Sequence, residues 1–105
     1  GRIIVLVSMS GKRSKSNLAS YSISKFALMS LCQTMRNEGW NKGIRVTAIC
    51  PGWVNTDMAK EINHFPKEDM TQPNNIATIC SNILDLPNHS VPFEIALNCQ
   101  LETAS

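Results

Sequence analysis

An unbroken aliphatic run at residues 3–7, Ile-Ile-Val-Leu-Val, constrains the fold of this chain more than any other feature. Consecutive side chains of a strand point to opposite faces of a sheet, so a run that is apolar at every position is expected to be buried on both faces. Interior strands of parallel sheets have this property, and the run ends at the small polar residues Ser8, Ser10 and Gly11. The chain is therefore expected to contain a parallel sheet, whose strands need crossover helices between them.

The next segments predict one such crossover. Apolar residues at helical spacing predict a helix over roughly residues 20–38, which two glycines then stop. A second apolar run over residues 44–49 predicts another strand, and Pro51 and Gly52 are expected to end it because proline removes a ladder donor. A strand, a helix and a strand in this order imply a right-handed parallel connection.

The remaining segments predict a second helix and a third strand. Pro73 and Asn74 open a helix with one apolar face, and Pro87 closes it. Alternation of apolar and polar residues over 93–98 predicts a strand at or near a sheet edge. Residues 60–72 are rich in charge and predict a surface loop or lid. The predicted order is β-α-β-α-β within a single α/β domain, residues 1–105.

Composition excludes several classes of partner. Ten basic and eight acidic residues give a net charge of +2, which is too balanced to favour nucleic acid or an anionic membrane. The longest aliphatic run is far shorter than the roughly 20 residues that cross a bilayer. Neither histidine has a ligand-type residue at a suitable spacing, so no metal site is expected. Four cysteines lie far apart in apolar stretches, namely Cys32, Cys50, Cys80 and Cys99. This spacing favours small core residues in a reducing compartment, so a cytoplasmic protein is predicted.

Tyr21 and Lys25 are four residues apart on the predicted helix, so their side chains leave the same face. A free phenol ionises near pH 10, and lowering its pKa to about 7 takes roughly 4 kcal/mol. An ammonium group at about 5 Å supplies roughly 3 kcal/mol at an effective dielectric constant near 20. Tyr21 is therefore a candidate acid and base near neutral pH, and Ser8 is a candidate to hold the same substrate oxygen.

The segment from Gly1 to Ser8, followed thirteen residues later by Tyr21-Ser22-Ile23-Ser24-Lys25, resembles the fifth strand and active-site motif of the short-chain dehydrogenase/reductase family. In that family the serine, tyrosine and lysine are catalytic, and the lysine also binds the ribose hydroxyls of the cofactor. The resemblance thus implies catalytic roles for Ser8, Tyr21 and Lys25. It also implies that Tyr21 and Lys25 contact the cofactor.

A second motif, Pro51-Gly52-Trp53-Val54-Asn55-Thr56, resembles the loop that lies against the nicotinamide in the same family. The residues that the resemblance assigns to cofactor binding are Pro51, Gly52, Val54 and Thr56. A glycine lets the backbone approach a flat ring closely. Backbone amides near Val54 and the Thr56 hydroxyl are groups that can bond a carboxamide.

The resemblance implies the C-terminal part of a doubly wound parallel-sheet (Rossmann) fold without its N-terminal strands and Gly-rich phosphate loop. Because the chain opens on a buried strand without an initiator methionine, an upstream part is expected. The implied cofactor is NAD or NADP, with NADP slightly preferred, and the implied substrate is a small carbonyl compound or alcohol. A homo-oligomer through the long helix is also implied, where Leu28, Met29 and Met35 are candidates for a helix interface or for core packing.

Three functions stay open at this point. The first is an NAD(P)-dependent oxidoreductase that interconverts a carbonyl and an alcohol, of which the present fragment alone would be inactive. The second is a sugar-nucleotide epimerase or dehydratase with a similar Tyr/Lys pair, although the loop with Thr56 favours the first. The third is a truncated remnant that acts only in dimerisation, which the absent phosphate loop supports.

Overall fold

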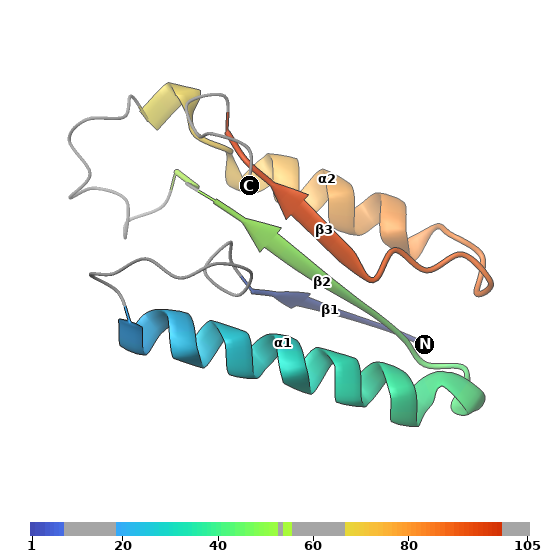
Figure 1. The fold of residues 1–105 in the computed structure, drawn as a ribbon. Helices are drawn as coiled ribbons and strands as arrows, with labels where there is room; N and C mark the ends of the chain where they lie inside the picture. Colours follow the sequence, from blue (N-terminus) through green and yellow to red (C-terminus); the bar gives the residue numbers. More distant parts are fainter. Residues whose placement is uncertain (8–18, 53, 56–66, 100–105) are drawn as a thin grey trace.

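The computed structural model describes residues 1–7, 19–52, 54–55 and 67–99, with the backbone alone at 19–22 and 67. In these residues the three strands form one parallel sheet in the order β1-β2-β3, which confirms the α/β class and the β-α-β-α-β order (Figure 1). The elements are β1 (Arg2–Leu6), α1 (Ala19–Gly39), the 3-10 turn η3 (Trp40–Lys42), β2 (Arg45–Pro51), the 3-10 turn η5 (Lys67–Asp69), α2 (Pro73–Leu84) and β3 (Glu94–Leu97).

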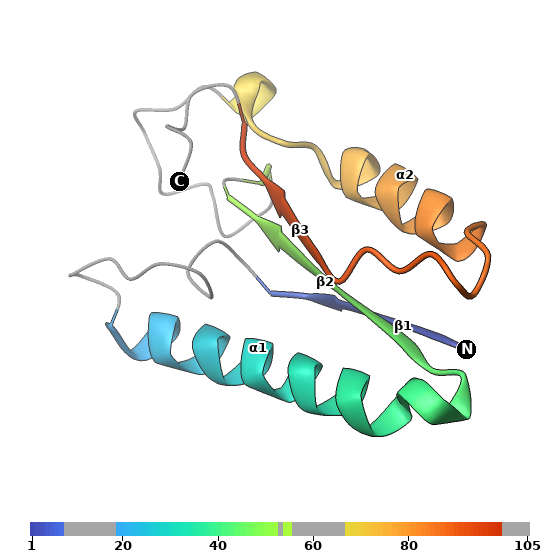
Figure 2. The same ribbon diagram turned by 45° about the vertical axis from the view of Figure 1, so that its right-hand side comes forward.

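The sheet lies between the two helices, with α1 on one face and α2 on the other (Figures 1 and 2). The central strand β2 is buried at every residue from 46 to 51, because both of its faces are covered. Strand β3 is paired on one side alone among the described residues, and it alternates in exposure as its sequence predicts. Its half-buried residues are Ile95 and Leu97, and its exposed residues are Glu94 and Ala96.

The main core lies between α1 and the sheet. Met29 and Cys32 of α1 are buried there together with residues of β1 and β2, namely Val7, Val46, Ala48 and Cys50. The α1-facing residues of β2 are every second one, as the pleat requires. Cys32 and Cys50 are free thiols with no exposed surface, so the expectation that they are small core residues is confirmed for both.

Leu28 and Met35 are partly buried against this same core. With Met29 buried as well, core packing is confirmed for all three candidates, and their part in a helix interface stays a prediction. The reason for their packing is the helical period, since these residues lie on the stripe that faces the sheet. From residue 23 onward, the large apolar side chains that α1 exposes are Ile23, Phe26 and Leu31.

Strand β2 ends at Pro51, as predicted, and the N–H of Gly52 still donates to the carbonyl oxygen of Leu97 at 2.8 Å. On the other side of β2 the pairing with β1 runs to Val7, whose N–H donates to the Ile49 carbonyl oxygen at 2.7 Å. The next donor toward β1 would be the nitrogen of residue 51, and a proline has no N–H to donate. The missing donor of Pro51 therefore lies where the β1–β2 ladder stops.

The prediction of a surface loop over residues 60–72 is partly wrong. The part of it that the structure describes contains the turn η5, and Met70 and Thr71 are 4% and 7% exposed. Residues 60–66 lie outside the described residues. The end of this segment is thus a packed entry into α2.

Two arginines at the amino edge of the sheet fix the turn after α2. Arg2 Nη2 donates to three carbonyl oxygens of residues 86–90 at 2.8–3.2 Å. Arg45 Nε donates to the carbonyl oxygen of Asn88 at 2.8 Å, and its guanidinium lies 3.8 Å from the centre of the Trp40 ring. These contacts hold the end of α2 against the starts of β1 and β2.

Candidate active site at the carboxyl edge of the sheet

The carboxyl ends of all three strands meet at one edge, and both helices begin there (Figure 1). In open parallel sheets, ligands bind outside this edge because the loops that follow the strands converge on it. The end of β1, which precedes Ser8, and the end of β2, which leads into the Pro51 loop, both lie at this edge. The candidate site is built from these segments and from the first turns of α1.

Tyr21 and Lys25 lie one turn apart in the continuous helix α1, so their positions share a face. Lys25 is half-buried, and the next residue on that face, Met29, is 8% exposed in the core. The face that carries Lys25 therefore turns toward the sheet. The Tyr21 position extends this face by about 6 Å toward the carboxyl edge, while its side chain lies outside the described part of the structure.

A contact between two sulfur atoms joins this helix face to the strand that leads into the Pro51 loop. The Cys50 thiol donates to the Met29 sulfur at 3.9 Å within the core. Met29 is one turn after Lys25, and Cys50 immediately precedes Pro51. The core thus fixes the helix that bears the Tyr/Lys pair relative to the loop at the end of β2.

Burial raises the pKa of the Cys32 thiol, which lies in the same core. A thiol with a raised pKa stays protonated at neutral pH and is a poor nucleophile. Cys32 is therefore a packing residue, and no covalent chemistry is assigned to it.

The loop after β2 is anchored on its far side by the segment that enters α2. Val54 forms an isolated parallel bridge with Thr71, and the N–H of Asn55 donates to the Thr71 carbonyl oxygen at 2.9 Å. Asn55 Nδ2 donates to Gln72 Oε1 at 3.0 Å. The sequence did not predict these contacts, because amide side chains in polar segments carry no periodic signal.

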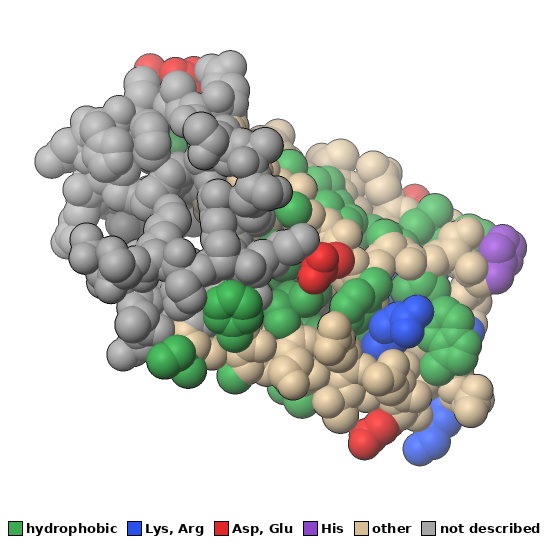
Figure 3. All heavy atoms as spheres, in the orientation of Figure 1, with side chains coloured by type: hydrophobic (Ala, Val, Ile, Leu, Met, Phe, Trp, Pro, Cys, Tyr) green, Lys and Arg blue, Asp and Glu red, His purple; other side chains and the backbone are tan. Residues whose placement is uncertain are grey.

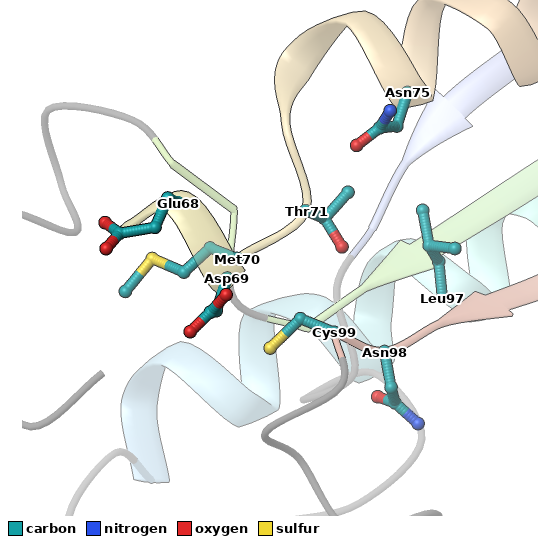
Figure 4. Close-up of a pocket in the computed structure, with 8 residues that line it drawn as sticks. All are labelled: Glu68, Asp69, Met70, Thr71, Asn75, Leu97, Asn98 and Cys99. Atoms are coloured by element: carbon teal, nitrogen blue, oxygen red, sulfur yellow. The ribbon is translucent and has the colours of Figure 1, made fainter. Parts of the chain in front are cut away.

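An open pocket of about 360 Å³ lies beside this anchor, between η5, the start of α2 and the end of β3 (Figure 4). Its lining combines the carboxylates of Glu68 and Asp69 and the buried Thr71 with apolar side chains such as Leu97. The buried Oδ1 atom of Asn98, another lining residue, has no hydrogen-bond partner in the structure. The two carboxylates and the Asn98 oxygen accept hydrogen bonds, so the pocket suits a polar group that donates them.

Ser8 and Thr56, two of the predicted site residues, lie outside the described residues. Val7, directly before Ser8, is buried and donates its N–H to the carbonyl oxygen of Ile49 at 2.7 Å, so the pairing of β1 extends up to the predicted serine. In the described ranges, no three His, Cys, Asp or Glu side chains are grouped closely enough to hold a metal ion. No described helix is long and apolar enough to cross a membrane.

Comparisons with known proteins agree with this arrangement. The family model described as short chain dehydrogenase matches residues 1–67. Agropine synthesis reductase from Rhizobium rhizogenes is 34% identical over 103 residues, which are 98% of this chain and 24% of that protein. The chain thus spans about a quarter of the length of this curated relative.

Two solved structures are similar over nearly the whole chain. A betaketoacyl-[ACP] reductase from Bacteroides thetaiotaomicron is 33% identical with a TM-score of 0.80, over 96% of this chain and 41% of that chain. An alcohol dehydrogenase from the archaeon Thermococcus sibiricus, complexed with 5-hydroxy-NADP, is 25% identical with a TM-score of 0.84, over 100% of this chain and 44% of that one. The sheet and helices of this chain therefore correspond to less than half of each structure and match part of its parallel-sheet fold.

Proposed function

This chain belongs to the short chain dehydrogenase family, whose similar members are oxidoreductases, and from that membership we propose that the complete protein interconverts a carbonyl and an alcohol with NAD or NADP. In this proposal Tyr21 is the acid and base, Lys25 tunes it and Ser8 holds the substrate oxygen. The 105 residues alone are proposed to be inactive, because they contain no Gly-rich phosphate-binding loop.

The observation that carries the proposal is the placement of Lys25. Its half-buried position faces the sheet, and the Met29–Cys50 contact one turn later ties this face to the strand that ends at Pro51. An ammonium group beside a phenol favours the phenolate and lowers the pKa of the phenol. A tyrosine one turn before Lys25 on the same face is therefore suited to exchange protons near neutral pH.

The residues of the Pro51 loop fit a nicotinamide cofactor. Gly52 is half-buried and has no side chain to keep a flat ring away from the backbone. The Asn55 N–H points to Thr71, and consecutive amides of an extended segment point to opposite sides, so the Val54 N–H points away from that anchor. Pro51, Gly52, Val54 and Thr56 are therefore proposed to hold the nicotinamide end, together with Tyr21 and Lys25 on α1.

When bound, the cofactor would supply or accept the hydride. The chain's own residues do the remaining work at the substrate oxygen. Tyr21 donates its phenolic proton to the carbonyl oxygen in reduction and takes a proton from the alcohol in oxidation. Lys25 stabilises the phenolate, and the Ser8 hydroxyl donates a hydrogen bond that keeps the oxygen near Tyr21.

Net oxidation of reduced cofactor by the complete protein tests this function. The protein is incubated with NADPH or NADH and a panel of ketones and aldehydes, and absorbance at the reduced nicotinamide band is followed. A reductase consumes the cofactor in proportion to product, with NADPH proposed to be the slightly better one. An epimerase regenerates its cofactor in each cycle, so unchanged absorbance with every carbonyl compound contradicts the proposal.

We also propose that the complete protein forms a homo-oligomer through α1. The helix exposes three large apolar side chains, Ile23, Phe26 and Leu31, which are 68%, 41% and 51% exposed. Apolar side chains reach the surface along this helix in Figure 3. Apolar side chains gathered on one helix are characteristic of an interaction surface. We further propose a cytoplasmic location, where the four free cysteines, three of them buried, would stay reduced.

A further inference from the structure

Two segments far apart in the chain meet beside the proposed cofactor loop. Residues 54–55 follow β2, and residues 70–72 lead into α2. They are joined by the Val54–Thr71 bridge, by the backbone hydrogen bond from Asn55 to Thr71 and by the side-chain hydrogen bond from Asn55 to Gln72. The cofactor loop is thus held from the side opposite α1.

Gln72 is itself held firmly. Its Nε2 donates to the Met70 carbonyl oxygen at 3.1 Å, while its Oε1 accepts from Asn55. Its backbone N–H donates to Asn75 Oδ1 at 2.8 Å, and its carbonyl oxygen accepts from the Asn75 N–H at 2.9 Å. These reciprocal bonds cap α2, so the side chain of Gln72 projects from a fixed helix start.

The anchor holds one side of the loop, and among the described residues no backbone hydrogen bond is formed by the Val54 N–H on the other side. The N–H of Asn55 is bound to Thr71. The preceding amide, that of Val54, points the opposite way. Rotation of residues 54–55 would turn the Val54 N–H from the side opposite Thr71, and the Asn55–Gln72 hydrogen bond opposes that rotation.

We propose that Asn55 and Gln72 are positioning residues, whose amide–amide hydrogen bond fixes the Val54 backbone in the orientation that holds the carboxamide of the nicotinamide. This inference rests on the proposed function. Neither residue touches the cofactor; both act through Val54. The contact is distinct from the Tyr/Lys pair, which lies on α1 and is held by the core.

The test uses the complete protein and titrates cofactor binding by the fluorescence of NADPH. Gln72→Met keeps the length of the side chain and removes its hydrogen bonds, and we expect it to raise the Kd about fivefold, the equivalent of one net hydrogen bond. Asn55→Ala is expected to give a similar loss, and the double variant no more than either single variant. The kcat is expected to change less than twofold, because α1 is undisturbed.

Two further measurements separate positioning from general stability. Gln72→Glu keeps an oxygen for the Asn55 amide but loses the hydrogen bond to Met70, so it is expected to recover part of the loss in Kd seen in Gln72→Met. The backbone amide of Asn55 is expected to exchange its hydrogen faster in Gln72→Met without cofactor. The control is Asn82→Ala, which removes an exposed amide from the same helix and should leave Kd and exchange unchanged.

Unchanged Kd in Gln72→Met and Asn55→Ala, or losses that add in the double variant, would overturn the positioning role while leaving the reductase proposal intact. An equal loss in Gln72→Glu would also overturn it. If the unsubstituted protein binds neither NADPH nor NADH, the proposed function fails, and the positioning role falls with it.

Discussion

Met29→Ala is predicted to weaken both the fold and the proposed active site. Met29 is 8% exposed in the core between α1 and the sheet, and its sulfur accepts from the Cys50 thiol at 3.9 Å. Truncation of a buried methionine removes apolar contacts and leaves a cavity, which costs about 2–5 kcal/mol. In a domain of about 150–250 residues each kcal/mol lowers Tm by roughly 2–4 °C, so we expect a fall of about 6–12 °C for a mid-range loss of about 3 kcal/mol.

The measurement is thermal unfolding of the complete protein, with turnover followed at a temperature where both proteins are folded. Gln33→Ala is the matched control, because Gln33 is exposed on the same helix and lies outside the proposed oligomer surface. Truncation of an exposed residue is expected to cost less than about 0.5 kcal/mol. A Met29→Ala protein as stable as Gln33→Ala would refute the packing of α1 on the sheet.

Three further perturbations test separate parts of the structure. Gly43 has φ of 78°, which side chains rarely adopt, so Gly43→Ala should lower stability by about 1 kcal/mol in chemical denaturation. Burial raises the pKa of the Cys32 thiol above its value in the unfolded chain, so the contribution of this thiol to stability is present at neutral pH and is lost as pH rises above about 8.5. The protein should therefore unfold more easily at pH 9.5 than at pH 7.5. Cys32→Ala should reduce that difference. Leu31→Lys places a charge on the exposed face of α1 and should shift the complete protein toward monomer in sedimentation, whereas an unchanged mass would argue against that interface.

The elements of the fold follow closely from local pattern. The helix expected over residues 20–38 is Ala19–Gly39, and the one expected to open at Pro73 begins there, because helical periodicity and proline both act on neighbouring residues. The end of β2 at Pro51 also follows from local sequence, because a proline supplies no donor to the ladder.

The candidate site was predictable only in part. The placement of Lys25 on the sheet-facing side of α1 follows from helical spacing. The anchor formed by Asn55 and Gln72 does not, because it joins amides 17 residues apart through a turn that has no periodic pattern. Contacts of this kind depend on tertiary packing, and the structure is needed to find them.

The exchange of a proton by Tyr21 is the centre of the proposed function, and Tyr21→Phe in the complete protein tests it most directly. This change removes the hydroxyl and keeps the ring, so turnover is expected to fall at least about 10²-fold while the Kd for NADPH stays nearly unchanged. Turnover within tenfold of the original protein would contradict the acid and base role of Tyr21.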